Sequence, residues 1–180
     1  MLRVVIALLL ATSLSAATLP GVRVETLGSA AGFVTSLAVD SRGILYYTTT
    51  RGDLFRLDAG QSVRVARVET EAISNSGLLG MALIDDTTAA VHYTTPLQTH
   101  EVIATIDLTT GAETIVAKLA ADASAPGRPT PPEHHGGNPT VADDGSIFVG
   151  IGDYGGFAIA QSPDWIAGKI LRVRPDGRVE

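Results

Sequence analysis

The stretch SLAVDSRGILYYTTTRGDLFRLDAG, residues 36–60, decides the fold. Apolar and β-branched runs flank a turn at 40–43, and a further run follows a second turn at 51–53. Short runs of this kind, bounded by Asp and Gly, are typical of antiparallel strands. The stretch therefore predicts a small antiparallel meander.

The same pattern occurs twice more along the chain. In each copy an Asp-containing turn precedes two predicted strands, at 85–86, 90–94 and 101–107 in the second copy and at 143–145, 146–151 and 169–174 in the third. If Asp40, Asp85 and Asp143 are equivalent marks, the repeats are 45 and 58 residues apart. Repeats of this size with several strands each are typical of propeller blades.

We therefore predict an all-β fold, a partial β-propeller of about three four-stranded blades. A β-sandwich also has short strands and frequent turns, and it stays open as the alternative. Residues 120–137 break the repeat because they are rich in Ala, Pro, Gly and Ser. They are predicted to form a long loop between blades, and long loops are often functional.

The N-terminal sequence MLRVVIALLLATSLSAATLP has a positive charge at Arg3, an apolar run at 4–10 and small residues up to Ala17. This order is typical of a cleavable secretory signal. A transmembrane anchor is the alternative, but a spanning helix needs about 20 apolar residues and this run lapses at Thr12. We predict a signal peptide at 1–17, a propeller domain at 18–180, and a periplasmic or extracellular location.

The amino-acid composition limits the kinds of molecule that the protein is expected to bind. The chain of 180 residues has a net charge of -6 and contains no cysteine. Without cysteine, no disulfide can stabilise an exported domain. Nucleic-acid binding needs a basic face, and the acidic composition argues against it. A small-molecule partner is therefore expected.

Three strings of residues are more specific than a general propeller pattern. They are Gly-Leu-Leu-Gly-Met-Ala at 77–82, His-His-Gly-Gly-Asn at 134–138 followed by Gly-Asp-Tyr-Gly at 152–155, and Gly-Lys-Ile-Leu-Arg-Val at 168–173 followed by Pro-Asp-Gly at 175–177. In this order they resemble motifs of the soluble pyrroloquinoline quinone (PQQ) dependent glucose and aldose dehydrogenases, the glucose/sorbosone dehydrogenase family. The resemblance implies a six-bladed propeller about twice as long as this chain, of which only the N-terminal half is matched.

The resemblance implies catalytic roles for two of these residues. His134 is similar to the family's catalytic base, which removes the proton of the sugar's anomeric hydroxyl while hydride passes to the quinone. Asp153 is similar to the carboxylate that orients this base. A carboxylate on one ring nitrogen of a histidine fixes the tautomer and leaves the other nitrogen to accept a proton. Taken alone, a His pair in a Gly-rich loop is more often solvated, and an Asp between glycines is more often a turn former.

Two amides complete the candidate site. Asn75 stands where many members of the family have a Gln that binds substrate or quinone, and Asn138 stands where they have an Arg. We include both as candidate substrate- or cofactor-binding residues, although Asn lacks the cationic fork of Arg. Adjacent His134 and His135 raise the alternative of zinc, but neighbouring side chains of an extended chain point apart, and no metal-ligand residues are assigned.

The resemblance implies PQQ and calcium as cofactors and an aldose as substrate, with most cofactor-binding groups in later blades. The predicted function is oxidation of a sugar's anomeric hydroxyl by hydride transfer to the quinone, with activity in doubt for these 180 residues alone. The alternatives are a non-catalytic propeller module that binds a protein or glycan, and a lactonase-like hydrolase with calcium. Because a half ring would leave apolar faces uncovered, self-association is also expected.

Overall fold

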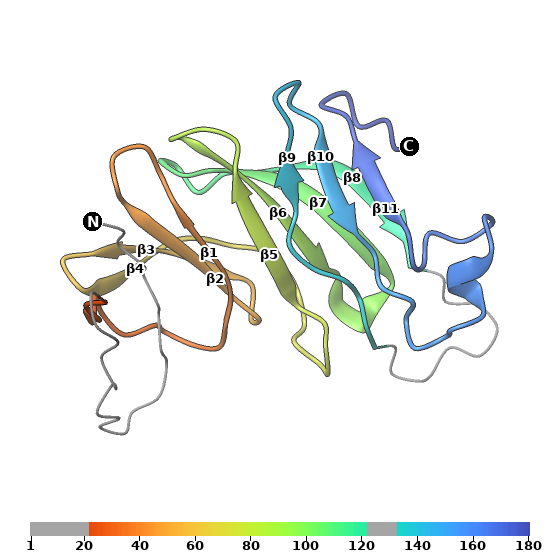
Figure 1. Cartoon of the computed structure of the whole chain (residues 1–180), viewed down its shortest axis with the longest axis horizontal. Helices are drawn as coiled ribbons and strands as arrows, with labels where there is room; N and C mark the ends of the chain where they lie inside the picture. The colour runs from red at the N-terminus through yellow and green to blue at the C-terminus, as the bar shows by residue number, and fades with distance from the viewer. Residues whose placement is uncertain (1–21, 122–132) are drawn as a thin grey trace.

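A computed structural model describes residues 22–121 and 133–180 of the chain (Figure 1). The predicted signal peptide at 1–17 lies outside these ranges, as do residues 122–132 of the predicted loop. Within the described ranges, no helix combines the length and the apolar character that crossing a membrane requires.

Three antiparallel sheets follow one another along the chain, so the predicted all-β fold class is confirmed. The first contains β1 (Val34–Val39), β2 (Leu45–Thr49), β3 (Asp53–Asp58) and β4 (Gln61–Arg67). The second contains β5 (Leu78–Leu83), β6 (Thr88–Thr94), β7 (His100–Asp107) and β8 (Glu113–Ala120). The third contains β9 (Thr140–Val141), β10 (Ile147–Gly150) and β11 (Ile170–Val173), and short 3-10 turns form at η1 (Pro96–Gln98) and η2 (Ile159–Gln161).

The third sheet has three strands in the described part of the chain, one fewer than the prediction of four-stranded blades. At the outer edge of β11, Val179 forms a single antiparallel bridge with Val173. The backbones of Arg172 and Glu180 exchange hydrogen bonds of 2.8 and 2.9 Å there. This pairing covers too few residues to form a fourth strand.

The repeated aspartates lie in equivalent turns. Asp40 and Asp85 follow the first strand of their sheets, and Asp143 follows β9. The carboxylate of Asp40 accepts backbone N–H bonds from Arg42 and Ile44, and that of Asp85 accepts one from Thr87. In the third sheet it is the neighbouring Asp144 that accepts the bond, from the backbone N–H of Ser146. The repeat read from the sequence therefore corresponds to one sheet per copy, with an Asp-stabilised turn between its first two strands.

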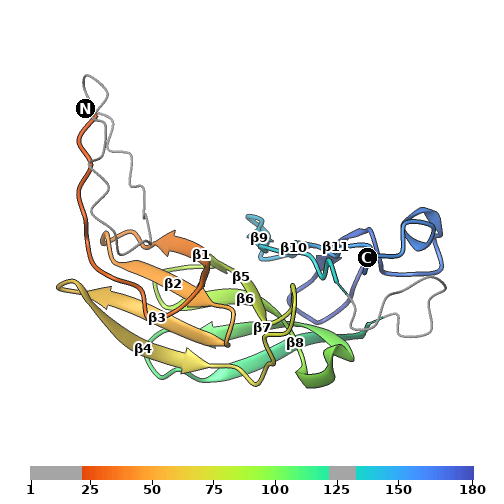
Figure 2. The ribbon, with the colours of Figure 1, turned by 90° about the horizontal axis from the view of Figure 1, so that it is seen from below.

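The first strands of the three sheets lie side by side, as neighbouring blades of a propeller require (Figure 2). The hydroxyl of Ser36 on β1 donates to the carbonyl oxygen of Met81 on β5 at 3.1 Å. An added Cβ at Gly80 on β5 would lie 2.6 Å from Cα of Asn138, just before β9. Gly80 therefore allows the close approach that joins the second sheet to the third.

The two central strands of the middle sheet, β6 and β7, are buried on both faces, because each neighbouring sheet packs against one of them. Ala89, Val91 and Tyr93 of β6 contribute to the core shared with the first sheet. Ala90 of β6 and Ile103 of β7 contribute to the core shared with the third. This alternation follows from the two-residue period of a strand. His92 and Glu101 are therefore on the face toward the third sheet.

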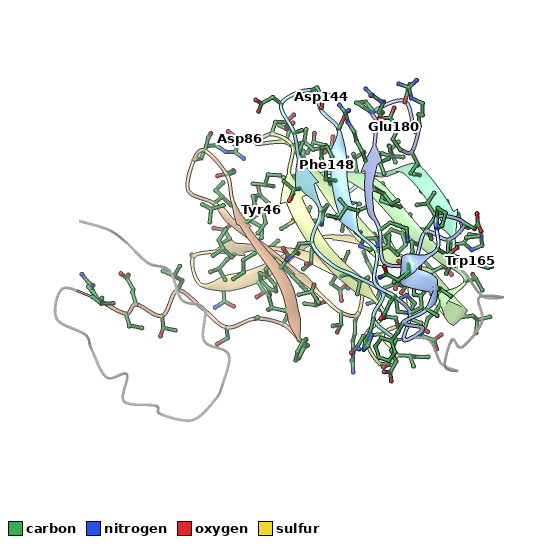
Figure 3. The ribbon with its side chains drawn as sticks, turned by 45° about the vertical axis from the view of Figure 1, so that its right-hand side comes forward. Tyr46, Asp86, Asp144, Phe148, Trp165 and Glu180 are labelled. Atoms are coloured by element: carbon green, nitrogen blue, oxygen red, sulfur yellow. The ribbon has the colours of Figure 1, made fainter. Side chains whose placement is uncertain are left out.

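The segments that carry the candidate residues lie at one end of the sheets, the lower end in Figure 1. We call this end the site end, and it comprises residues 71–77, 95–99, 133–138 and 151–156. The Asp-containing turns lie at the opposite end, where Asp86, Asp144 and Glu180 are labelled in Figure 3.

Candidate functional site

The backbone register brings His134 and Asp153 together. The segment before β9 continues its pairing with the segment after β10, with an antiparallel bridge between Gly136 and Ile151. In an antiparallel pair, a residue two positions before one partner lies opposite the residue two positions after the other. His134 and Asp153 occupy those positions, and His134 Nδ1 lies 2.8 Å from Asp153 Oδ1.

Two glycines allow this close pairing. An added Cβ at Gly152 would lie 1.6 Å from the carbonyl oxygen of His134, and one at Gly136 would lie 2.1 Å from the carbonyl oxygen of Gly150. Both distances are far below van der Waals contact. The glycines of the two motifs therefore serve backbone approach, and the side chains beside them are available for chemistry.

His134 presents one ring nitrogen for chemistry. An ionised carboxylate only accepts hydrogen bonds, so Nδ1 of His134 donates to Asp153. In the neutral ring, the lone pair is then on Nε2. The His134 side chain is 50% exposed, which leaves the ring accessible from solvent. Its φ of 53° is in the left-handed region, which residues other than Gly rarely adopt without support from their surroundings.

Asp153 is held ionised by two donors. Its Oδ1 accepts the backbone N–H of Gly155 at 2.9 Å as well as His134 Nδ1. The bonds from the Gly155 N–H and from His134 outweigh partial burial and lower the pKa of Asp153 below its usual value. The carboxylate therefore stays an acceptor at neutral pH, which fixes the His134 tautomer.

The two candidate asparagines have different surroundings. Asn75 is exposed in the 71–77 loop, beside the buried Ser76. Asn138 is exposed and packs against Gly80, so it joins the Gly-Leu-Leu-Gly motif to the His-His-Gly-Gly motif. Asn75 thus lies in a site-end loop, while the position of Asn138 gives it at least a structural role.

His135 is separated from His134 in the structure. Its side chain is fully buried, and its Nδ1 lies 2.8 Å from Glu101 Oε1, whereas His134 faces Asp153. Among the described residues, no three His, Asp or Glu side chains gather in a group that could hold a metal ion. The two adjacent histidines therefore bind two different carboxylates.

A buried set of polar residues beneath this loop was not predicted from the sequence. It consists of His92, Gln98, Glu101 and His135, and we call it the buried histidine network. The sequence contains one signal for this set. His92 and Glu101 are polar residues within strands that are otherwise largely apolar and buried on both faces. A polar residue at such a position requires a buried hydrogen-bonding partner.

Comparison of the sequence with known families places the chain in one of them. Residues 34–180 match the sequence profile described as glucose/sorbosone dehydrogenase. The chain belongs to the glucose/sorbosone dehydrogenase family. The comparison with curated proteins gave no match.

Solved structures of low sequence identity share the fold of this family member. A glucose dehydrogenase described as a putative oxidoreductase, from Thermus thermophilus, has a TM-score of 0.70 at 22% identity, over 86% of this chain and 48% of its own. The PQQ-bound aldose sugar dehydrogenase of Streptomyces coelicolor has a TM-score of 0.69 at 23% identity, over 85% and 48%. The apo-form of the soluble aldose sugar dehydrogenase of Escherichia coli has a TM-score of 0.63 at 18% identity, over 86% and 47%. The chain thus spans about half the length of these structures.

The lowered pKa of Asp153 leads to a prediction of how the stability of the protein changes with pH. The folded-state pKa is below the usual 3.8, so the ionised carboxylate stabilises the fold above that value and loses its contribution as pH falls through the lower folded pKa. The Asp153→Asn variant lacks this contribution. We expect it to be less stable than the parent near neutral pH, with the difference shrinking as pH falls from about 6 to about 2.

Urea unfolding of both proteins across this pH range measures the difference directly. Subtracting the two curves removes the titration of all other carboxylates, provided that they keep their partners. A difference that stays constant with pH would show that Asp153 makes no charge-dependent bond in the folded state.

Proposed function

We propose that this chain carries the proton-accepting part of a sugar-oxidising site, with His134 as general base and Asp153 as its positioning residue. One observation carries the proposal: the bond from His134 Nδ1 to Asp153 Oδ1 leaves Nε2 of a half-exposed imidazole as the proton acceptor. Membership of the glucose/sorbosone dehydrogenase family supports an aldose as the substrate.

The proposed reaction oxidises the anomeric carbon of an aldose. His134 Nε2 takes the proton of the anomeric hydroxyl, the C1–O bond becomes a carbonyl, and the hydrogen on C1 leaves with its electron pair as hydride. The imidazole of His134 then carries a proton on each nitrogen, and the Asp153 carboxylate stabilises this imidazolium. The product of this step is a lactone. Its C1 oxygen is a carbonyl oxygen and carries no proton that His134 could accept.

PQQ is the hydride acceptor that we propose, because a solved relative of the same fold is PQQ-bound. When bound, the quinone would accept the hydride from the sugar. Its three carboxylates require cationic partners.

The described cations of the third sheet are engaged elsewhere. Arg172 is bonded to Asp144, and Arg174 to Glu180, at the end opposite the site end (Figure 3). Lys169 Nζ donates to the carbonyl oxygens of Ala160 and Ala167 at 2.8 and 2.9 Å. His134 and Asp153 fit the proton-accepting chemistry beside a quinone. Arg172, Arg174 and Lys169, as paired in this structure, do not fit the binding of its carboxylates. We derive no step through the quinone, and calcium stays an expectation of the family resemblance.

Dye-linked oxidation of aldoses, with PQQ and calcium supplied, tests the proposal. Reduction of the dye that depends on both the aldose and PQQ supports it. Tight aldose binding without any turnover, under conditions in which PQQ is shown to be bound, would instead support a non-catalytic module.

The non-catalytic module is the second candidate. Its support is Asn138, which stands where the family pattern has an Arg and packs against Gly80. A glycan-binding protein would need neither a hydride acceptor nor a base. Loss of glycan binding on His134→Ala, with no dye reduction by the parent, would favour it.

The N-terminal pattern of residues 1–20 supports export, and we propose a periplasmic or extracellular location for the protein. N-terminal sequencing of the protein recovered from outside the cytoplasm tests this. A mature terminus at Thr18 is expected.

A further inference from the structure

Beneath the His134 loop, three ionisable side chains share one fully buried site between the second and third sheets. Glu101 Oε2 lies 3.0 Å from His92 Nε2, and Glu101 Oε1 lies 2.8 Å from His135 Nδ1. All three side chains are 0% exposed. Both carboxylate oxygens of Glu101 are therefore bonded to imidazole nitrogens at a site closed to solvent.

His92 has a partner at each ring nitrogen. Its other nitrogen, Nδ1, lies 3.0 Å from the carbonyl oxygen of Gly137. Burial raises the pKa of the Glu101 carboxyl group, but the bonds from His135 and His92 outweigh this effect and lower the pKa below its usual value. The ionised Glu101 carboxylate thus joins the two buried imidazoles.

The network also extends to the loop that carries Asn75. His135 Nε2 lies 3.4 Å from Gln98 Oε1. The Gln98 amide nitrogen donates to the carbonyl oxygen of Ile73 at 3.2 Å and to Ser76 Oγ at 3.0 Å. Because the carbonyl oxygen of Ile73 only accepts, the amide nitrogen of Gln98 must face Ile73. The amide oxygen of Gln98 therefore faces His135. Ser76 directly follows Asn75.

We propose that the buried histidine network is a positioning device that holds the two loops bearing His134 and Asn75 in one fixed relation. His135 and Gly137, the residues one and three positions after His134, are anchored to Glu101 and His92. Anchors this close explain how His134 keeps a left-handed φ of 53° and stays opposite Asp153. The use of these loops for sugar oxidation rests on the proposed function, but the positioning itself does not.

Imidazole nitrogen NMR of the purified protein tests the proposal without sugar or cofactor. The chain has four histidines, so two-bond hydrogen–nitrogen spectra can assign each ring. At neutral pH we expect the neutral ring of His134 to be almost entirely the Nδ1–H tautomer. A mixture of the two His134 tautomers in the parent protein would overturn the proposal.

The informative variant is Glu101→Gln, which keeps the size of the side chain but replaces one acceptor oxygen by an amide donor. We expect the minor Nε2–H tautomer of His134 to rise several-fold. The matched control is Glu113→Gln, since Glu113 on β8 accepts from the Tyr93 hydroxyl, away from the network. The control should leave the His134 tautomer unchanged.

A second variant keeps the test decisive if Glu101→Gln does not fold. His92→Gln retains one amide donor for Glu101 but removes the ring that holds Gly137, so the His134 tautomer should again become mixed. An unchanged His134 tautomer in a folded variant of either kind would overturn the positioning role. Failure of aldose oxidation, with these spectra as expected, would instead count against the proposed function alone.

Discussion

Replacing His134 by alanine is expected to lower aldose oxidation by at least about a hundredfold, the low end for removal of a general base. The anomeric hydroxyl then has no group to take its proton as hydride leaves C1. Folding should be little affected, because the His134 side chain is half exposed. The measurement is dye-linked kcat/KM for an aldose, in a form of the protein that oxidises aldoses.

His100→Ala is the matched control. His100 begins β7, and its ring lies beside the hydroxyl of the neighbouring Thr99 at 3.0 Å. Its removal takes away an imidazole at the site end without touching Asp153. Turnover by His134→Ala within a few-fold of the parent, or an equal loss in His100→Ala, would remove His134 from the mechanism.

Replacing Glu101 by alanine should have the largest effect on stability. It leaves the ring nitrogens of His92 and His135 buried without their carboxylate partner. Leaving a buried polar group without its hydrogen bond costs about 1–3 kcal/mol, and two such groups are affected. For a chain of this size, each 1 kcal/mol shifts Tm by roughly 2–4 °C. Urea unfolding and thermal melting measure the loss.

The control for this substitution is Glu69→Ala, because Glu69 is exposed after β4. Its removal should change the free energy of unfolding by about 0.5 kcal/mol or less. If Glu101→Ala were no more destabilising than this control, the buried carboxylate would have to be uncharged or solvated in the protein.

The fold was predictable because its signals are local. The Asp-containing turns at 40–43, 85–86 and 143–145 recur at each first hairpin, and their carboxylates bond the adjacent backbone. Such bonds depend only on residues a few positions apart. In the third sheet, residues 178–180 pair with the outer edge of β11 through the bridge between Val173 and Val179.

The candidate site was only partly predictable. Sequence motifs named His134 and Asp153, but their contact depends on the register that pairs Gly136 with Ile151. The buried histidine network joins residues 9 and 34 positions apart, on β6, β7 and the His134 loop. Alternation could mark His92 and Glu101 as buried polar residues. It could not identify their partners, because Glu101 reaches His92 from the next strand of the same sheet, and His135 and Gly137 come from the distant segment before β9.

The structure of the protein with a bound aldose is the most direct test of the central claim, that His134 accepts the proton of the anomeric hydroxyl. We expect the C1 hydroxyl oxygen to lie within about 3.2 Å of His134 Nε2, with Nδ1 still bonded to Asp153. An aldose bound with its C1 hydroxyl on another group, and His134 Nε2 facing solvent, would contradict it.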